Sequence, residues 1–89
     1  MILKIKSRGE KETSVNYSIL VENHDNYENY FEAQLIVISL PEDEPLADRK
    51  GYIYRYKVPQ LEEVESRNSF MSFAEAYIEG IYNISKHVE

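Results

Sequence analysis

The two histidines are the first residues of this sequence to consider for catalysis or metal binding. His24 is followed by Asp25, a pairing in which a carboxylate can orient an imidazole that acts as a general base. His87 lies far from His24 along the chain, and neither histidine has the ligand spacing of a zinc site. We therefore expect His24 to be an ordinary surface residue, and we predict neither a catalytic histidine nor a zinc site.

Clustered carboxylates are the second candidate chemistry. Glu42, Asp43 and Glu44 are consecutive, and oxygen ligands of this type suit Ca²⁺. They lack the ligand at every second position and the central glycine of a calcium-binding loop. The sequence also contains no P-loop, no G-x-G-x-x-G and no G-x-S-x-G motif. We predict a protein that is not an enzyme and that has no cofactor and no metal site.

An aromatic segment is the third candidate. Residues 50–56 read Lys-Gly-Tyr-Ile-Tyr-Arg-Tyr, which partly resembles the RNP1 segment of RNA-recognition domains, a resemblance that implies RNA binding. The segment departs from that pattern at Ile53, Arg55 and Lys57, and residues 8–12 are too few for the helix which that fold needs between its first two strands. We expect the tyrosines to form a core wall beneath a helix. Single-stranded RNA binding is the alternative for the stripe of Tyr52, Tyr54 and Tyr56.

The distribution of charge is more informative than these motifs. The net charge is −6, and eight of the ten basic residues lie just outside an acidic stretch, within residues 4–11 and 49–57. The stretch itself, residues 12–48, contains no Lys or Arg and nine acidic residues: Glu12, Glu22, Asp25, Glu28, Glu32, Glu42, Asp43, Glu44 and Asp48. Such a pattern bears on solubility and on the choice of partner.

These features favour a small non-enzymatic protein-binding module that occupies a basic, nucleic-acid-binding surface of a larger partner. Nucleic-acid-mimicking inhibitors, bacterial immunity proteins and phage anti-defence proteins act in this way, and the link to them is analogy. Tyr27 and Tyr30 add aromatic contacts of the kind enriched at interfaces. The alternative is a homo-oligomeric accessory subunit. The electrostatic contacts are assigned to Glu22, Asp25, Glu28, Glu42, Asp43, Glu44 and Asp48.

Length and composition limit the architecture and the location. We expect one domain over residues 1–89, and the absence of cysteine excludes disulfides. The longest apolar run, residues 35–40, is far shorter than the ~20 residues of a membrane span. Lysines interrupt residues 1–6, which therefore do not resemble a signal peptide. We expect a cytoplasmic protein with no membrane contact and no direct nucleic-acid contact.

Alternating and helical patterns predict four strands followed by one helix. The strands are residues 1–7, 13–21, 30–40 and 51–58, and residues 60–67 allow at most one helical turn. Ser72 and Glu75 form a capping box that begins a helix over residues 72–87, and Gly80 allows close approach to the sheet. The predicted buried face of this helix is Phe73, Ala74, Tyr77, Ile78, Ile81, Ile84 and Val88.

The simplest assembly is an α+β fold, a four-stranded antiparallel meander with the helix on one face. The tightest registers place Thr13 opposite Ser7, Val21 opposite Phe31 and Leu40 opposite Gly51. The first and fourth strands are then edges, protected by outward Lys and Arg. The helix covers Leu3, Ile5, Val15, Tyr17, Ile19, Phe31, Leu35, Val37, Tyr54 and Tyr56.

The opposite sheet face should carry a small apolar patch of Ile36, Ile38 and Ile53. An apolar centre with a polar rim is typical of an interface. We therefore expect a partner, or a weak homodimer, to use this face. The alternative is that residues 60–64 fold back over the patch and make it ordinary core.

Overall fold

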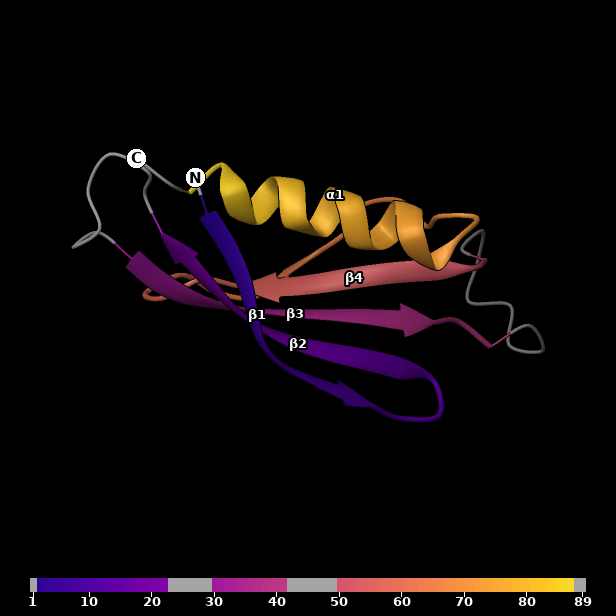
Figure 1. Ribbon diagram of the computed structural model, residues 1–89. Coiled ribbons are helices and arrows are strands. Elements are labelled where there is room, and N and C mark those ends of the chain that lie inside the picture. The colour runs from indigo at the N-terminus through magenta and orange to yellow at the C-terminus, as the bar shows by residue number, and fades with distance from the viewer. Residues whose placement is uncertain (1, 23–29, 42–49, 88–89) are drawn as a thin grey trace.

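The sheet is an antiparallel meander with one helix on one face. The computed structural model describes residues 2–22, 30–41 and 50–87. Within these ranges the strand order is β1-β2-β3-β4-β5, and α1 lies across one face of the sheet (Figure 1). The elements are β1 (Ile2–Glu10), β2 (Ser14–Glu22), β3 (Tyr30–Ser39), β4 (Tyr52–Lys57), β5 (Val64–Glu65) and α1 (Phe73–Ser85). The α+β prediction is confirmed, but the predicted strand count is one too few because β5 was not expected.

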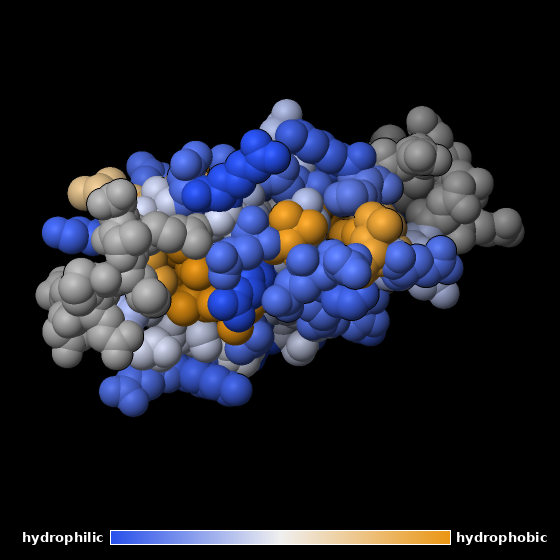
Figure 2. All heavy atoms as spheres, turned by 180° about the vertical axis from the view of Figure 1, so that it is seen from behind, coloured by the Kyte–Doolittle hydropathy of each residue, from blue (hydrophilic) through white to orange (hydrophobic). Residues whose placement is uncertain are grey.

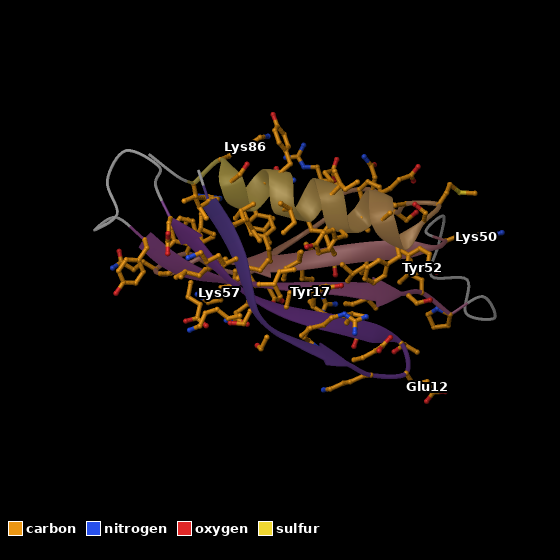
Figure 3. The ribbon with its side chains drawn as sticks, in the orientation of Figure 1. Glu12, Tyr17, Lys50, Tyr52, Lys57 and Lys86 are labelled. Carbon is orange, nitrogen blue, oxygen red and sulfur yellow. The ribbon has the colours of Figure 1, made fainter. Side chains whose placement is uncertain are left out.

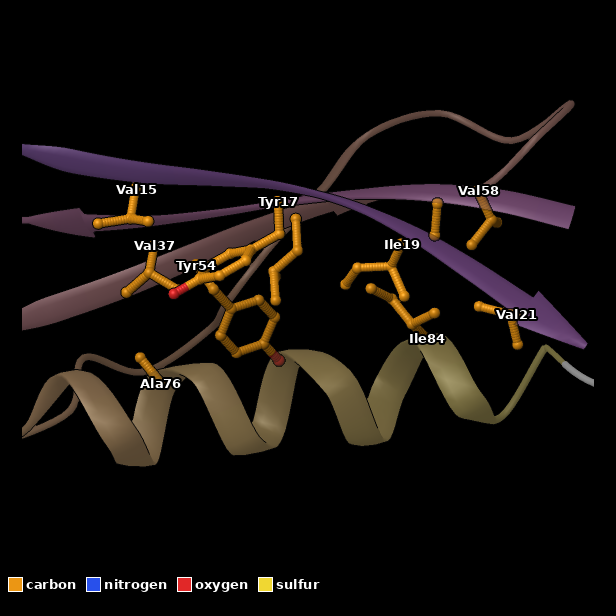
Figure 4. Packing of buried hydrophobic residues seen from close by; sticks show 11 residues of the cluster. Val15, Tyr17, Ile19, Val21, Val37, Tyr54, Val58, Ala76 and Ile84 are labelled. Carbon is orange, nitrogen blue, oxygen red and sulfur yellow. The ribbon is translucent and has the colours of Figure 1, made fainter. Parts of the chain in front are cut away.

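The core lies between α1 and the central strands. In β2 every second side chain is buried, because successive side chains of a strand point to opposite faces. Ile19 and Val21 of β2 and Ala76 and Ile84 of α1 are all 0% exposed. Figure 4 shows these side chains in the space between the sheet and the helix. Burial of this apolar surface is the main force that joins the two layers.

Helix α1 begins where the capping box predicts. The Ser72 Oγ accepts a hydrogen bond of 3.2 Å from the Glu75 backbone N–H, which satisfies a donor that the first turn leaves unpaired. The row buried against the sheet is Ala76, Gly80 and Ile84. Two residues predicted for the buried face, Ala74 and Ile78, are instead exposed, because the row that contacts the sheet is centred on Gly80.

Gly80 is the point of closest approach between α1 and the sheet. A Cβ at this position would lie 2.6 Å from the Leu35 Cδ1 and 3.4 Å from the Tyr54 Cγ. Any larger residue would therefore have to displace a core side chain or lift the helix. The expectation that Gly80 allows close approach is confirmed.

The predicted registers of the central strands are confirmed, and that of the first hairpin is wrong. Val21 lies opposite Phe31, and the Leu40 N–H donates to the Gly51 carbonyl at 2.8 Å. In the first hairpin, however, Ser7 lies opposite Ser18 rather than Thr13. The strand continues to Glu10, so the turn begins later than residues 8–12 suggested.

A β-bulge between Ile5 and Ser7 divides β1 into two halves. It changes which side chains face the helix, because an extra residue reverses the alternation. Arg8 then lies opposite Tyr17, with its guanidinium carbon 5.9 Å from the centre of the Tyr17 ring. Ile5 is 52% exposed, so the prediction that α1 covers it is wrong. Leu3 does pack against the core.

The segment after β4 forms a turn and a fifth strand instead of a helical turn. Pro59 and Gln60 occupy the centre of a tight turn, in which the Leu61 N–H donates to the Val58 carbonyl at 3.3 Å. Gln60 has a φ of 67°, a left-handed conformation that a type II turn requires and that interrupts a helix. Strand β5 then pairs with β4, so β4 is not the edge strand that was predicted.

Replacing Gly80 tests the close approach of the helix. A Gly80→Ala change gains about 1 kcal/mol of helix propensity, but overpacking a core typically costs about 1–3 kcal/mol. We expect Gly80→Ala to lower the free energy of unfolding in the wild-type background. In a Leu35→Val background, which removes the obstructing methyl groups, we expect the same change to be neutral or stabilising. Urea denaturation of the wild type, the two single variants and the double variant gives the coupling free energy between residues 80 and 35. Additive effects of the two substitutions would contradict this packing.

Candidate functional site

The acidic residues assigned to partner binding lie mostly outside the described ranges. This applies to Asp25, Glu28, Glu42, Asp43, Glu44 and Asp48, and to the aromatic residue Tyr27. Glu22 and Tyr30 flank the first of the two segments that carry these residues, 23–29, and Pro41 and Lys50 flank the second, 42–49. The two segments therefore join the sheet near opposite ends of β3, whose ten residues span roughly 30 Å.

Glu22 and Tyr30 are the two assigned residues of this group that the structure describes. The Glu22 carboxylate lies 3.8 Å from the Lys4 ammonium, so an ion pair within the sheet already engages it. Tyr30 is 65% exposed at the start of β3, as an interface tyrosine should be. Glu12, also in the acidic stretch, lies at the tip of the β1–β2 hairpin and points away from the sheet (Figure 3).

The apolar patch expected on the uncovered sheet face is smaller than predicted. Ile38 does lie opposite Ile53, but Ile53 is only 4% exposed and Ile36 and Ile38 are half-buried. The chain beyond β4 pairs with that strand through β5 and through Phe70, so β4 has a neighbour on both sides. Ile53 is therefore ordinary core, and use of Ile36 and Ile38 by a partner stays a prediction.

The same sheet face carries a network of polar side chains across three strands. The Glu32 carboxylate accepts a 2.5 Å hydrogen bond from the Ser18 hydroxyl and lies 3.3 Å from the Lys6 ammonium. Gln34 donates to the Ser18 hydroxyl at 3.2 Å. The Ser18 hydrogen bond, and then Lys6, hold the pKa of Glu32 below its usual value. This part of the face is suited to solvent.

Figure 2 shows the side of the molecule that faces away from the viewer in Figure 1. Hydrophobic atoms reach the surface there in separate patches, and hydrophilic side chains lie between them. Any contact on this side would therefore combine apolar and polar groups, as most transient interfaces do.

A polar groove of about 430 Å³ lies between α1 and residues 64–68, and the sequence did not indicate it. Tyr54 lines this groove, and its hydroxyl accepts a 2.7 Å hydrogen bond from the Asn83 side-chain amide. The same amide nitrogen donates to the Glu79 carbonyl at 3.0 Å. The Ser66 hydroxyl, in a side chain that is 4% exposed, accepts from the Tyr54 N–H at 3.2 Å.

The environment of Tyr54 makes its hydroxyl a hydrogen-bonding group rather than a base. Burial, and then the Glu79 carboxylate, raise the pKa of Tyr54 to about 12. The phenol is therefore protonated at neutral pH, and it joins α1 to β4 through Asn83. Its chemistry in the groove is that of a structural cross-link.

The stripe of three tyrosines is a wall of the core, as expected. Tyr54 is 4% exposed, and Tyr52 and Tyr56 are half-buried against the same cluster. The Tyr54 ring stacks on Phe70 and on Tyr56, with centroids 5.9 and 6.2 Å apart. RNA binding through an exposed stripe needs these rings on the surface, and their burial argues against that alternative.

Of the histidine and metal candidates, only His87 lies within the described residues. His24 lies outside the described ranges, and the exposed His87 has its ring 6.0 Å from that of Tyr56. Residues 2–22, 30–41 and 50–87 contain no group of three His, Cys, Asp or Glu arranged to hold a metal ion. In the same residues no helix has both the length and the apolar character to cross a membrane.

Comparison of the chain with protein-family models, with curated proteins and with solved structures found no match to any of them.

Titration of Tyr54 tests the geometry of the groove. Because folding raises the pKa of Tyr54 from 10 to about 12, its contribution to stability is present below pH 10 and is lost as the pH rises from 10 to 12. Absorbance at 295 nm should therefore show a phenol ionising near pH 12 that is missing from Tyr54→Phe and present in the surface control Tyr30→Phe. Superimposable titrations of the wild type and Tyr54→Phe would contradict the assigned environment.

Proposed function

We propose that this protein is a small acidic binding module that occupies a basic surface of a larger protein and does not itself catalyse a reaction. The class of action is that of an inhibitor which competes with nucleic acid for its partner, by analogy with anti-defence and immunity proteins. One observation carries the proposal. The acidic stretch contains no cation of its own, and acids within the sheet already engage several of the basic residues that flank it.

Ion pairs on the sheet engage several of the basic residues that flank the acidic stretch. Lys6 pairs with Glu32 at 3.3 Å, and Arg55 pairs with Glu65 at 2.9 Å. Lys4 and Arg8 are likewise paired, with Glu22 and Glu10. These pairs are exposed, and each contributes little to stability.

These ion pairs matter for where the net negative charge of the protein lies. Four of the ten basic residues lie beside sheet carboxylates, two of which, Glu22 and Glu32, belong to the acidic stretch, so the net charge of −6 falls on the remaining residues. The surplus of negative charge then falls on acids such as Glu42, Asp43 and Glu44. A field of one sign steers an oppositely charged partner toward the protein and speeds association.

Charge reversal within the acidic stretch tests the proposal. The partner is first captured from a lysate of the source cells and purified, and its association is then followed by surface plasmon resonance. We expect Glu42→Lys with Asp43→Lys to slow association roughly tenfold, with a smaller effect on dissociation. Raising the salt concentration should slow the wild type in the same way, because exposed charges are screened within ~8 Å at physiological ionic strength.

A matched control separates local from overall charge. Glu62→Lys with Glu63→Lys makes the same change in net charge at two exposed residues outside the stretch, and it should have the smaller effect. An affinity that does not change with salt would reject the proposal and favour the accessory-subunit alternative. Equal losses in the two double variants would show that the acidic stretch is only solubilising.

A further inference from the structure

Helix α1 carries exposed apolar residues outside the row that packs on the sheet. Of its 13 residues, four are polar, namely Glu75, Glu79, Asn83 and Ser85. The row centred on Gly80 packs against the sheet, and the opposite side of the helix faces solvent (Figure 1). A helix that packs on one side normally presents charged or polar residues on the opposite side.

The exposed apolar residues of α1 lie on the side facing away from the sheet. At 3.6 residues per turn, Ile78 and Tyr82 are one turn apart and fall opposite the buried row. Ile78 is 64% exposed and Tyr82 is 58% exposed. Ala74, one turn before Ile78, is exposed and small enough to let another backbone approach closely. We call Ala74, Ile78 and Tyr82 the outer stripe.

Acidic residues border the outer stripe on one flank. Glu75 and Glu79 are one turn apart on the side next to Ile78 and Tyr82. Glu79 interacts with the Tyr54 hydroxyl, and no ion pair found among the described residues includes either glutamate. A cation also lies beside the stripe: the Lys86 ammonium is 4.5 Å from the Tyr82 ring centre, at the C-terminal end of α1 (Figure 3).

We propose that the outer stripe binds an amphipathic helix of the partner that carries Lys or Arg beside its apolar residues. The inference rests on the proposed function and names the contact surface. Apolar residues on the partner helix would cover Ile78 and Tyr82, and its cations would face Glu75 and Glu79. This is recognition of an amphipathic helix by an apolar stripe with complementary charge.

A second copy of this chain fits the stripe less well. An antiparallel pair of copies would bring their Glu75 and Glu79 rows together, and each copy carries a net charge of −6. The 13 residues of α1 extend roughly 20 Å, which matches a partner segment of three to four helical turns.

Two synthetic peptides of one composition test the inference. Both are 18-residue chains of Leu, Lys and Ala: one has leucines at i, i+3, i+4 and i+7, and the other has the same residues without that period. We expect the periodic peptide to bind the wild type at least tenfold more tightly. Ile78→Ser and Tyr82→Ser should abolish this preference, whereas Leu61→Ser and Tyr30→Ser, at residues 50% and 65% exposed, should leave it intact.

Each contrary result has a distinct meaning. Equal, salt-dependent binding of both peptides would contradict the assignment of the outer stripe as the contact surface and leave the proposed function standing. If neither peptide binds, the result counts against the assignment and against the proposed function. Loss of preference in the control variants would also overturn the assignment. Sedimentation equilibrium of the wild type should show a monomer, and a dimer that Ile78→Ser dissociates would assign the stripe to a second copy.

Discussion

The close contact of α1 with the sheet is the constraint on which the rest of the structure depends. One helix must supply the second layer for a five-stranded sheet, and it can do so only by lying very near β3 and β4. The absence of a side chain at Gly80 permits this, with Leu35 and Tyr54 filling the space that a larger residue would need. The buried row of α1, ending at Ile84, then closes the core.

Other parts of the chain pack at the two edges of the sheet, which one helix cannot cover. At the β1 edge, the bulge places Arg8 over Tyr17, so a cation and its aliphatic stem protect a core ring. At the opposite edge, the chain leading to Phe70 pairs with β4, in which Ile53 is 4% exposed. Exposed apolar side chains remain at several places, among them Ile5, Met71 and the outer stripe of α1. In the outer stripe they lie beside Glu75 and Glu79.

Local patterns were sufficient to predict the four longer strands, the helix and the central registers, because alternation in β2 and the Ser72 capping box act through near neighbours. The bulge after Ile5 could not be predicted, since one extra residue leaves no local trace and reverses the alternation. Strand β5 has two exposed residues, and only its pairing with β4 defines it. The acidic stretch was evident from composition, and its assigned contacts lie mostly outside the described residues. The outer stripe was missed because the apolar residues of α1 can be grouped at helical spacing into more than one face, so the sequence assigned Ile78 to the buried face. Only the contact of Gly80 with Leu35 shows which face is buried.

Native-state hydrogen exchange measures the dependence of the sheet on α1 most directly. If docking of α1 holds the core together, amides of Ile84 in α1 and of Ile19 and Leu35 in the sheet should exchange through one global opening. Their opening free energies should then be equal and should fall with denaturant along one line. Exchange of the α1 amides at a much lower free energy, with β2 and β3 still protected, would show that the sheet is stable without the helix and would contradict this account.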